Sequence, residues 1–277
     1  MTKIDVQNLN AQKAQIGILI LTKNEELHIA RCIDSARKIS KHIFVIDSFS
    51  DDRTINILQE KNICFIQNKF VNYGSQLQLG IKKFPFRCDY LLRLDADEYL
   101  SDELIKSLVN INTKYEGFNV SRTIKYCGVL IDIPGYLPQP NLRLFKRSNF
   151  EIIRPKMDEK IIVNGEVADL DGLLIDENLM GHKAWKTKHK KYASLEASTI
   201  LDNETGKSTV KAIYYNLPYF LRSFAFFFFY LILILIKKNK NKIINLKFIL
   251  VQILYYRLFV DVYIVKKRII KLFKSEN

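Results

Sequence analysis

The chain has 277 residues, of which 48% are hydrophobic, so it is long enough for one large domain or for one domain with an appendage. Its polar first fifteen residues indicate no secretory signal, and its four widely spaced cysteines, without a C-x-x-C pair, disfavour a disulfide framework or a zinc site. All of the net charge of +14 lies in residues 183–277, which indicates either nucleic acid or an anionic membrane surface as a partner.

Apolar runs alternate with helical patterns along the first hundred residues. The apolar runs predict buried strands at residues 16–21, 43–46, 63–66 and 90–94. Helical spacing predicts helices at residues 29–36, 54–60 and 76–83. This alternation predicts an α/β fold with a mostly parallel sheet and helices on both faces. No G-x-G-x-x-G motif is present, which argues against a dinucleotide-binding fold.

Polar clusters follow three of these strands, at residues 22–26, 47–52 and 95–98. Ligands of parallel sheets bind beyond the carboxyl ends of the strands, so we expect the clusters to form one site. Asp95 and Asp97 are two residues apart and point the same way on an extended chain. Such a pair suits Mg²⁺ or Mn²⁺ bridging to substrate phosphates. The alternative is a solvated loop that leads into a helix N-cap.

The second half of the chain begins with shorter extended pieces, including a loop at residues 134–140 and a strand at residues 141–145. A basic helix is predicted at residues 183–206. Residues 217–236 are apolar except near one end, but a spanning helix needs about 20 apolar residues, so this stretch is borderline between spanning, re-entrant and interfacial. Residues 243–265 are interrupted by charged and polar side chains, which favours an interfacial helix.

Lysine-rich segments at residues 237–242 and 266–268 flank these apolar runs. Basic residues near a membrane surface attract anionic lipids by about 1 kcal/mol each. Nucleic acid binding explains the charge but not residues 226–233, which would form a large exposed apolar patch. We therefore expect an anionic membrane surface, and no nucleic acid, as a partner. The competing structural interpretation is a buried helical hairpin packed on the main domain.

Five segments together resemble glycosyltransferase family 2, which has the GT-A fold, and are most similar to its lipopolysaccharide-core β-glucosyltransferase group. In chain order they are residues 20–26, 45–54, 72–78, 94–98 and 135–147. The resemblance covers about residues 15–200. It implies a polar lead-in at residues 1–14, a GT-A catalytic domain at residues 15–206 and a membrane-associating helical region at residues 207–277.

The resemblance also implies roles for individual residues. Those implied to bind the nucleotide sugar are Thr22, Glu25, Asp47, Asp52, Gln76, Asp95 and Arg143. Those implied to contact the metal or the diphosphate are Asp97 and His182. Other interpretations remain open: Asp47 and Asp52 as turn or cap residues, Glu25 as a helix first-turn acid, His182 as a structural histidine, and Arg143 as a solvated strand residue.

Catalysis with inversion needs a carboxylate that takes the proton from the acceptor hydroxyl. In the resembling group a His-Glu pair lies at the position of Asp158 and Glu159. Glu159 is therefore the expected base. Asp158 replaces the histidine and is a rival base. Both residues could instead belong to a solvated turn, because charged side chains are mostly exposed.

The expected activity is a metal-dependent, inverting transfer of a hexose from a nucleotide sugar, with a UDP-sugar favoured, to a lipid-linked or lipopolysaccharide-core glycan. The metal is Mg²⁺ or Mn²⁺. We expect a peripheral or monotopic protein at the cytoplasmic face of the inner membrane. The alternatives are a non-catalytic membrane-bound scaffold with the same fold and, less favoured, a basic nucleic-acid-binding protein.

Overall fold

The structure is a computed structural model that describes residues 14–153, 160–202, 219–237 and 240–275. The chain forms two compact units. The first unit comprises Met1–Ser121 and Pro140–Leu174, and the second comprises Arg122–Gln139 and Ile175–Asn277.

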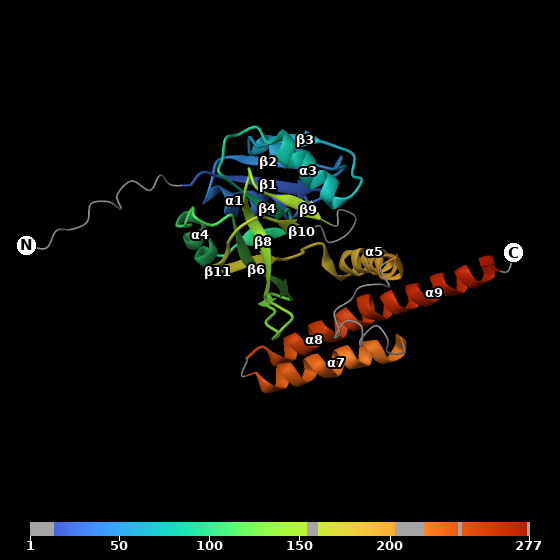
Figure 1. The fold of residues 1–277 in the computed structure, drawn as a ribbon. Helices are drawn as coiled ribbons and strands as arrows, with labels where there is room; N and C mark the ends of the chain where they lie inside the picture. Colours follow the sequence, from blue (N-terminus) through green and yellow to red (C-terminus); the bar gives the residue numbers. More distant parts are fainter. Residues whose placement is uncertain (1–13, 154–159, 203–218, 238–239, 276–277) are drawn as a thin grey trace, which may run out of the picture. The chain divides into compact units, whose positions relative to one another are not determined.

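Four parallel strands form the part of the sheet in the first unit that the alternating pattern predicts (Figure 1). They lie in the order β3-β2-β1-β4, with β1 paired to both β2 and β4. Their bounds are Ile16–Thr22 (β1), Ile43–Asp47 (β2), Cys64–Gln67 (β3) and Tyr90–Asp95 (β4). All four strands predicted within the first hundred residues are confirmed to within a residue or two at each end.

The sheet continues beyond β4 with further strands, of which β8 confirms the strand predicted at residues 141–145. β8 pairs antiparallel with β4, and the order then runs β8-β6-β11-β5, with β7 on the side of β6. A separate small sheet contains β9 and β10. The bounds are Glu98–Leu100 (β5), Gly117–Tyr126 (β6), Val129–Leu130 (β7), Gln139–Lys146 (β8), Glu151–Ile153 (β9), Lys160–Ile162 (β10) and Val167–Asp176 (β11). The sheet is therefore mixed, with parallel pairing among β3, β2, β1 and β4 and an antiparallel pair where β8 meets β4.

Alternating side chains of the parallel strands build two cores, one on each face of the sheet. On β1, Ile18 and Ile20 pack on one face and Leu19 and Leu21 on the other, as the two-residue period of a strand requires. Helices α1 (Ile29–Arg37), α2 (Thr54–Glu60) and α4 (Asp102–Val109) contribute to the first core, and α3 (Tyr73–Lys83) to the second. Helices on both faces are thus confirmed.

Local capping sets where α3 and α4 begin. Helix α3 starts three residues before its predicted start, because the Asn72 side chain accepts a hydrogen bond from the backbone N–H of Ser75. Ser101 caps α4 in the same way at Leu104. Gly80 lets α3 approach the sheet closely, since a Cβ there would lie 2.8 Å from the side chain of Leu19.

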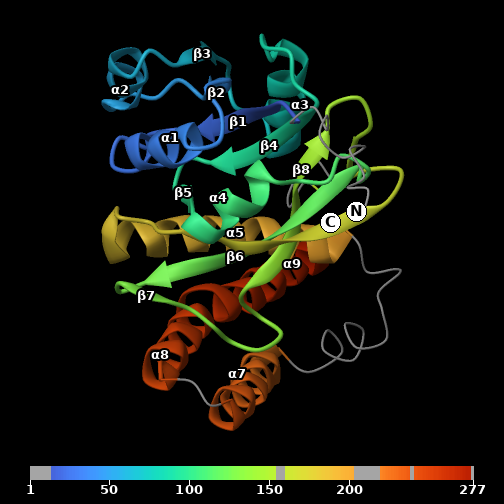
Figure 2. The same cartoon turned by 90° about the vertical axis from the view of Figure 1, so that its left-hand side faces the viewer.

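The second unit is largely helical (Figure 2). Its helices are α5 (Gly181–Asp202), α7 (Tyr219–Ile236), α8 (Lys242–Gln252), a π-helical turn (Ile253–Arg257) and α9 (Leu258–Ser275). Ala193 and Ala197 of α5 pack on α9, and Ile234 of α7 packs with Phe248 of α8. Among the helices of the described ranges, none is long and apolar enough to cross a membrane.

Candidate functional site

The strand register of the first unit aligns polar side chains in a row at the carboxyl edge of the sheet. Thr22 of β1 pairs with Asp47 of β2, and Asp47 pairs with Gln67 of β3. On the other side of β1, Asp95 of β4 pairs with Leu21, one position before Thr22. The expectation that these strand ends meet is therefore confirmed for Thr22, Asp47 and Asp95.

Asp47 is the most deeply buried residue of this row, with 0% of its surface exposed. Its carboxylate accepts hydrogen bonds from the backbone N–H of Ser50 at 2.8 Å, from the Ser50 hydroxyl, and from the Gln67 amide at 2.9 Å. A buried carboxylate without such donors would be strongly destabilising, so the neighbours of Asp47 fix its position. Gln67 was not predicted, although it closes the third apolar run at the same register.

Gln76 reaches the same strand end from helix α3. Its side-chain amide donates to the Ser48 hydroxyl at 3.0 Å and to the Asn68 carbonyl oxygen at 3.2 Å, and its oxygen accepts from the Asn68 side chain at 2.8 Å. The structure therefore places Gln76 beside the end of β2, as the predicted site requires. Its contact with a nucleotide stays a prediction.

The loops after β1 and β2 are tied to each other through Asn24 and Asp52. Asn24 has a positive φ of 55°, and its side chain accepts from the backbone N–H of Asp51 at 3.0 Å. Asp52 accepts from the backbone N–H of Glu26 at 3.1 Å and from that of Thr54 at 2.9 Å. Partial burial alone would raise the pKa of Asp52, but these hydrogen bonds outweigh it and hold the pKa below its ordinary value. Asp52 thus holds the turn before helix α2 (Thr54–Glu60), and its role toward a nucleotide stays a prediction.

Glu25 lies in the loop between β1 and α1, before the first turn of the helix, so the interpretation as a first-turn acid is wrong. One of its carboxylate oxygens lies 2.5 Å from Nδ1 of His28, which is fully buried. Its backbone N–H donates to the Thr54 hydroxyl at 2.8 Å. Both ends of Glu25 are therefore fixed. His28 was missed, because a single histidine at the start of a helical pattern carries no distinguishing signal.

Beyond β4, carboxylates and arginines form one cluster. Asp95 lies 3.0 Å from the Arg93 guanidinium and 3.6 Å from that of Arg143. Arg143 also donates to Glu98 at 2.7 Å, and Glu98 accepts from the backbone N–H of Asp95 at 2.8 Å. Arg143 and Glu98 are both buried, so the interpretation of Arg143 as a solvated strand residue is wrong. Asp95 and Glu98 both pair with the Arg143 guanidinium, and its approach to a diphosphate stays a prediction.

Asp97 is the predicted metal ligand, and it is buried, with 7% of its surface exposed. The extended chain on which Asp95 and Asp97 would point the same way is not present, because β4 ends at Asp95 and the chain turns at Ala96 and Asp97. Asp95 has two guanidinium partners. Within the described ranges no group of three potential metal ligands is present. Mg²⁺ commonly binds through one or two carboxylates and takes its remaining ligands from substrate phosphates and water, so Asp97 alone suits such a site.

Three predicted residues cannot be placed with their side chains. Asp158 and Glu159, the rival bases, lie outside the described residues. His182 is the second residue of helix α5, but its side chain lies outside the description. The roles of all three stay predictions.

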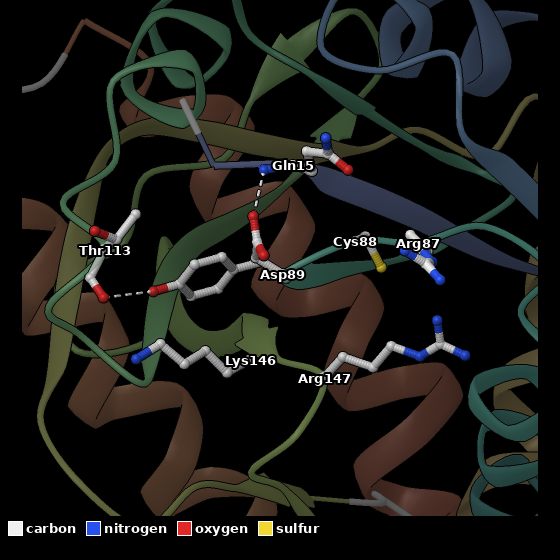
Figure 3. A pocket seen from close by; sticks show the side chains of 8 residues that line it. Gln15, Arg87, Cys88, Asp89, Thr113, Lys146 and Arg147 are labelled. Atoms are coloured by element: carbon white, nitrogen blue, oxygen red, sulfur yellow. Dashed lines mark hydrogen bonds between the residues drawn. The ribbon is translucent and has the colours of Figure 1, made fainter. Parts of the chain in front are cut away.

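A polar cavity of about 670 Å³ opens at the opposite edge of the sheet, near the starts of β1 and β4 (Figure 3). Three of its charged side chains, Asp89, Lys146 and Arg147, have partners within the protein. Lys146 pairs with Glu116, and Arg147 donates to the carbonyl oxygens of Phe84 and Phe86. Asp89 accepts from the backbone N–H of Gln15 at 2.8 Å. These contacts stabilise the amino-terminal edge, whereas the predicted site lies at the carboxyl edge.

Comparison with known proteins finds similar glycosyltransferases. An uncharacterized glycosyltransferase of Rickettsia typhi is 33% identical over 122 residues, which are 41% of this chain and 40% of that protein. The lipopolysaccharide core biosynthesis glycosyltransferase LpsC of Rhizobium meliloti is 26% identical over 234 residues, which are 76% of this chain and 80% of LpsC. The match thus spans about two fifths of the length of the Rickettsia relative.

Solved structures of glycosyltransferases are similar to the chain at low sequence identity. TarS of S. aureus, in complex with UDP-GlcNAc, aligns with a TM-score of 0.45 and 13% identity over 90% of this chain and 91% of that chain. Glucosyl-3-phosphoglycerate synthase from Mycobacterium tuberculosis aligns with a TM-score of 0.46 and 12% identity over 70% of this chain and 82% of that chain. The family model of glycosyl transferase family 2 matches residues 17–159, which are more than half of the chain. The chain therefore belongs to glycosyltransferase family 2, as its motifs indicate.

Proposed function

We propose that this protein is an inverting glycosyltransferase that moves a hexose from a nucleotide sugar, with a UDP-sugar favoured, to a lipid-linked or lipopolysaccharide-core glycan. The observation that carries the proposal is the aligned row of Thr22, Asp47 and Gln67 beside Asp95, at the edge where parallel sheets bind ligands. The acceptor class rests on the likeness to LpsC, which is named for lipopolysaccharide core biosynthesis.

The base of the donor would bind at Asp47. A uracil ring presents an N–H donor, and a carboxylate is an acceptor when ionised. The Asp47 carboxylate is held by Ser50 and Gln67, so its position is set before the ligand arrives. Thr22 adds a buried hydroxyl that has no hydrogen-bond partner among the residues that the structure describes. A nucleotide can supply that partner, which favours binding at this edge.

The diphosphate end of the donor would lie toward Asp97. A bound Mg²⁺ or Mn²⁺ would neutralise charge that develops on the leaving diphosphate. Asp97 would hold the ion, and Asp95, kept in place by Arg93 and Arg143, would face the ribose or the sugar. The arginines make Asp95 a fixed hydrogen-bond acceptor rather than a second metal ligand.

The transfer step needs one base. As the acceptor oxygen attacks the anomeric carbon, a carboxylate takes its proton, and the bond from that carbon to the diphosphate oxygen breaks with inversion. Glu159 is the proposed base, and Asp158 is its rival. Glu159→Gln should abolish turnover and keep donor binding, since the amide accepts no proton; full activity of this variant would transfer the role to Asp158.

The experiment for the donor site is calorimetric titration of the full chain with UDP, in parallel with ADP and GDP. Asp47→Asn places an N–H donor opposite the uracil N–H, so we expect UDP affinity to fall by about tenfold to a hundredfold, the cost of one lost charge-assisted hydrogen bond. The matched control is Asp89→Asn at the opposite edge, which should bind UDP as the wild type does. Equal UDP affinity in Asp47→Asn and wild type would remove the proposed base site. Absence of binding by all three nucleotides would favour a non-catalytic scaffold.

A further inference from the structure

Helix α7 has its polarity reversed relative to a helix on a water-facing surface. The helix residues that are exposed to solvent are apolar, among them Phe224, Phe228, Phe229, Ile232, Leu235 and Ile236. At 100° per residue these side chains fall on one continuous stripe along the helix. The polar side chains of the same helix, Arg222 and Ser223, are buried. Water favours the opposite arrangement.

The two helices that follow share part of this pattern. Asn245 and Gln252 of α8 and Asp261 of α9 are buried polar residues. Ile243 of α8 and Val262 of α9 are exposed apolar residues. These two helices also bury apolar residues such as Phe248, so the reversal is most complete in α7.

The buried polar groups have partners inside the unit. The Arg222 guanidinium lies 3.7 Å from Asp261, and the Ser223 hydroxyl lies 3.4 Å from the same carboxylate. The Asn245 side chain donates to the Asp132 carbonyl oxygen at 2.8 Å. Inward, paired polar groups with outward apolar groups are the arrangement of helices whose outer face contacts lipid. Exposed in water, the same face would form an apolar patch of the kind that marks an interaction site.

We propose that the exposed apolar stripe of α7 is a lipid-docking surface that lies in the interface of an anionic bilayer. The stripe comprises the six residues named above. Exposed lysines of the same unit, Lys240 after the end of α7 and Lys247 of α8, provide the charge complementarity that selects anionic lipids. The helix lies in the plane of the bilayer, which makes the protein peripheral or monotopic, and the cytoplasmic leaflet of the inner membrane offers the required anionic lipids. Lipid binding by the second unit does not depend on the proposed transfer.

Vesicle flotation of the full chain tests the apolar part of the surface. The wild type should float with vesicles of phosphatidylethanolamine and phosphatidylglycerol. Phe228→Ser combined with Ile232→Ser removes two side chains from the stripe and should lower the partition coefficient by about a hundredfold, since each buried apolar side chain contributes roughly a factor of ten. The matched control is Val167→Thr, an exposed apolar residue of β11 in the first unit, which should float as the wild type does.

Lysine variants test the charged part of the surface, and a folding control separates lost lipid binding from lost structure. Lys240→Gln and Lys247→Gln should each weaken binding about fivefold, and only on anionic vesicles. Circular dichroism checks that each variant is folded. For any variant that is not, a fluorophore attached to Phe228→Cys in a Cys64→Ser, Cys127→Ser background reports immersion in lipid, because Cys64 and Cys127 are exposed thiols. Val167→Cys in the same background is the control. Wild-type flotation of the double variant, or a label at Phe228→Cys that stays in water on vesicles, contradicts the proposal. A wild-type dimer that the double variant converts to a monomer, without any vesicle binding, would assign the stripe to a second copy of the chain.

Discussion

The hydroxyl of Thr22 is the most informative single group at the carboxyl edge. The residue is 5% exposed, and its Oγ1 has no hydrogen-bond partner in the described part of the chain. A buried hydroxyl without a partner costs about 1–3 kcal/mol of folding free energy. Such a cost is typical of a group whose partner arrives with a ligand.

Thr22→Val should therefore separate stability from binding. The variant keeps the shape of the side chain and removes the unsatisfied hydroxyl, so we expect the free energy of unfolding to stay equal or to rise by about 1 kcal/mol. UDP affinity should fall by about fivefold to tenfold, because one hydrogen bond is lost. Urea denaturation and calorimetric titration measure the two quantities.

Thr54→Val is the matched control for Thr22→Val. The Thr54 hydroxyl is buried and accepts from the backbone N–H of Glu25 at 2.8 Å, so its loss should destabilise the protein by about 1–2 kcal/mol. A Thr22→Val variant that is destabilised as much as Thr54→Val would show that Thr22 has a structural partner in solution.

At the scale of elements, the Ser101 side chain joins helix α4 to strand β11. Its hydroxyl accepts from the backbone N–H groups of Leu104, at 3.2 Å, and Leu173, at 2.9 Å. Ser101→Ala should lower the free energy of unfolding by about 1–2 kcal/mol, since an N-cap and a second buried bond are lost together. Thermal unfolding measures this change. Ser107→Ala, inside the same helix, should be neutral or slightly stabilising, and an equal effect of both changes would contradict the capping role.

Helices α7 and α9 are joined by an acid whose titration affects stability. Burial raises the pKa of Asp261 to about 6, and the nearby Arg222 guanidinium only partly offsets this effect. Because the folded pKa is raised, the stabilisation is complete below pH 4, the range of the unfolded carboxyl, and is lost as the pH rises through about 6. We expect the free energy of unfolding to fall by about 1–3 kcal/mol over this range. Partial solvation of the carboxyl group favours the lower end of these values.

Melting temperatures measured between pH 4 and pH 8 test the titration of Asp261. Asp261→Asn should remove this component of the pH dependence, so that the difference between wild type and variant changes between pH 4 and pH 7. Asp171→Asn, an exposed carboxylate on β11, should follow the wild-type profile. Parallel profiles of Asp261→Asn and wild type would show that Asp261 titrates normally.

At the scale of the whole molecule, the sequence predicts the elements of the parallel half of the sheet better than it predicts the site. The parallel strands are continuous apolar runs, and these specify both type and position. Of the later strands, β8 matches a predicted strand, but β11 carries no such run: it exposes much of its length and pairs with strands distant in sequence. Helix α3 begins three residues before its predicted start because the N-cap Asn72, and not the spacing of apolar residues, determines where the first turn begins.

The site was predictable where a polar residue ends an apolar run, as at Thr22, Asp47 and Asp95. Gln67 follows the same rule but was missed, because one amide after a short run is also common in loops. The turn at Asp97 was missed because the carboxylate spacing was interpreted on an extended chain. The ion pairs of Arg143 with Asp95 and Glu98 join residues 45 or more positions apart, which a local pattern does not encode.

Donor turnover by the purified full chain is the most direct measurement of the proposed function. A panel of nucleotide sugars is incubated with Mn²⁺, Mg²⁺ or EDTA, and nucleotide release is followed for wild type, Asp97→Ala and the opposite-edge control Asp89→Asn. We predict metal-dependent release from one UDP-sugar, lost in Asp97→Ala and EDTA and kept in Asp89→Asn. Release that survives in Asp97→Ala would contradict the metal site, and a folded wild type that turns over no donor, with membrane lipid supplied, would contradict the glycosyltransferase activity.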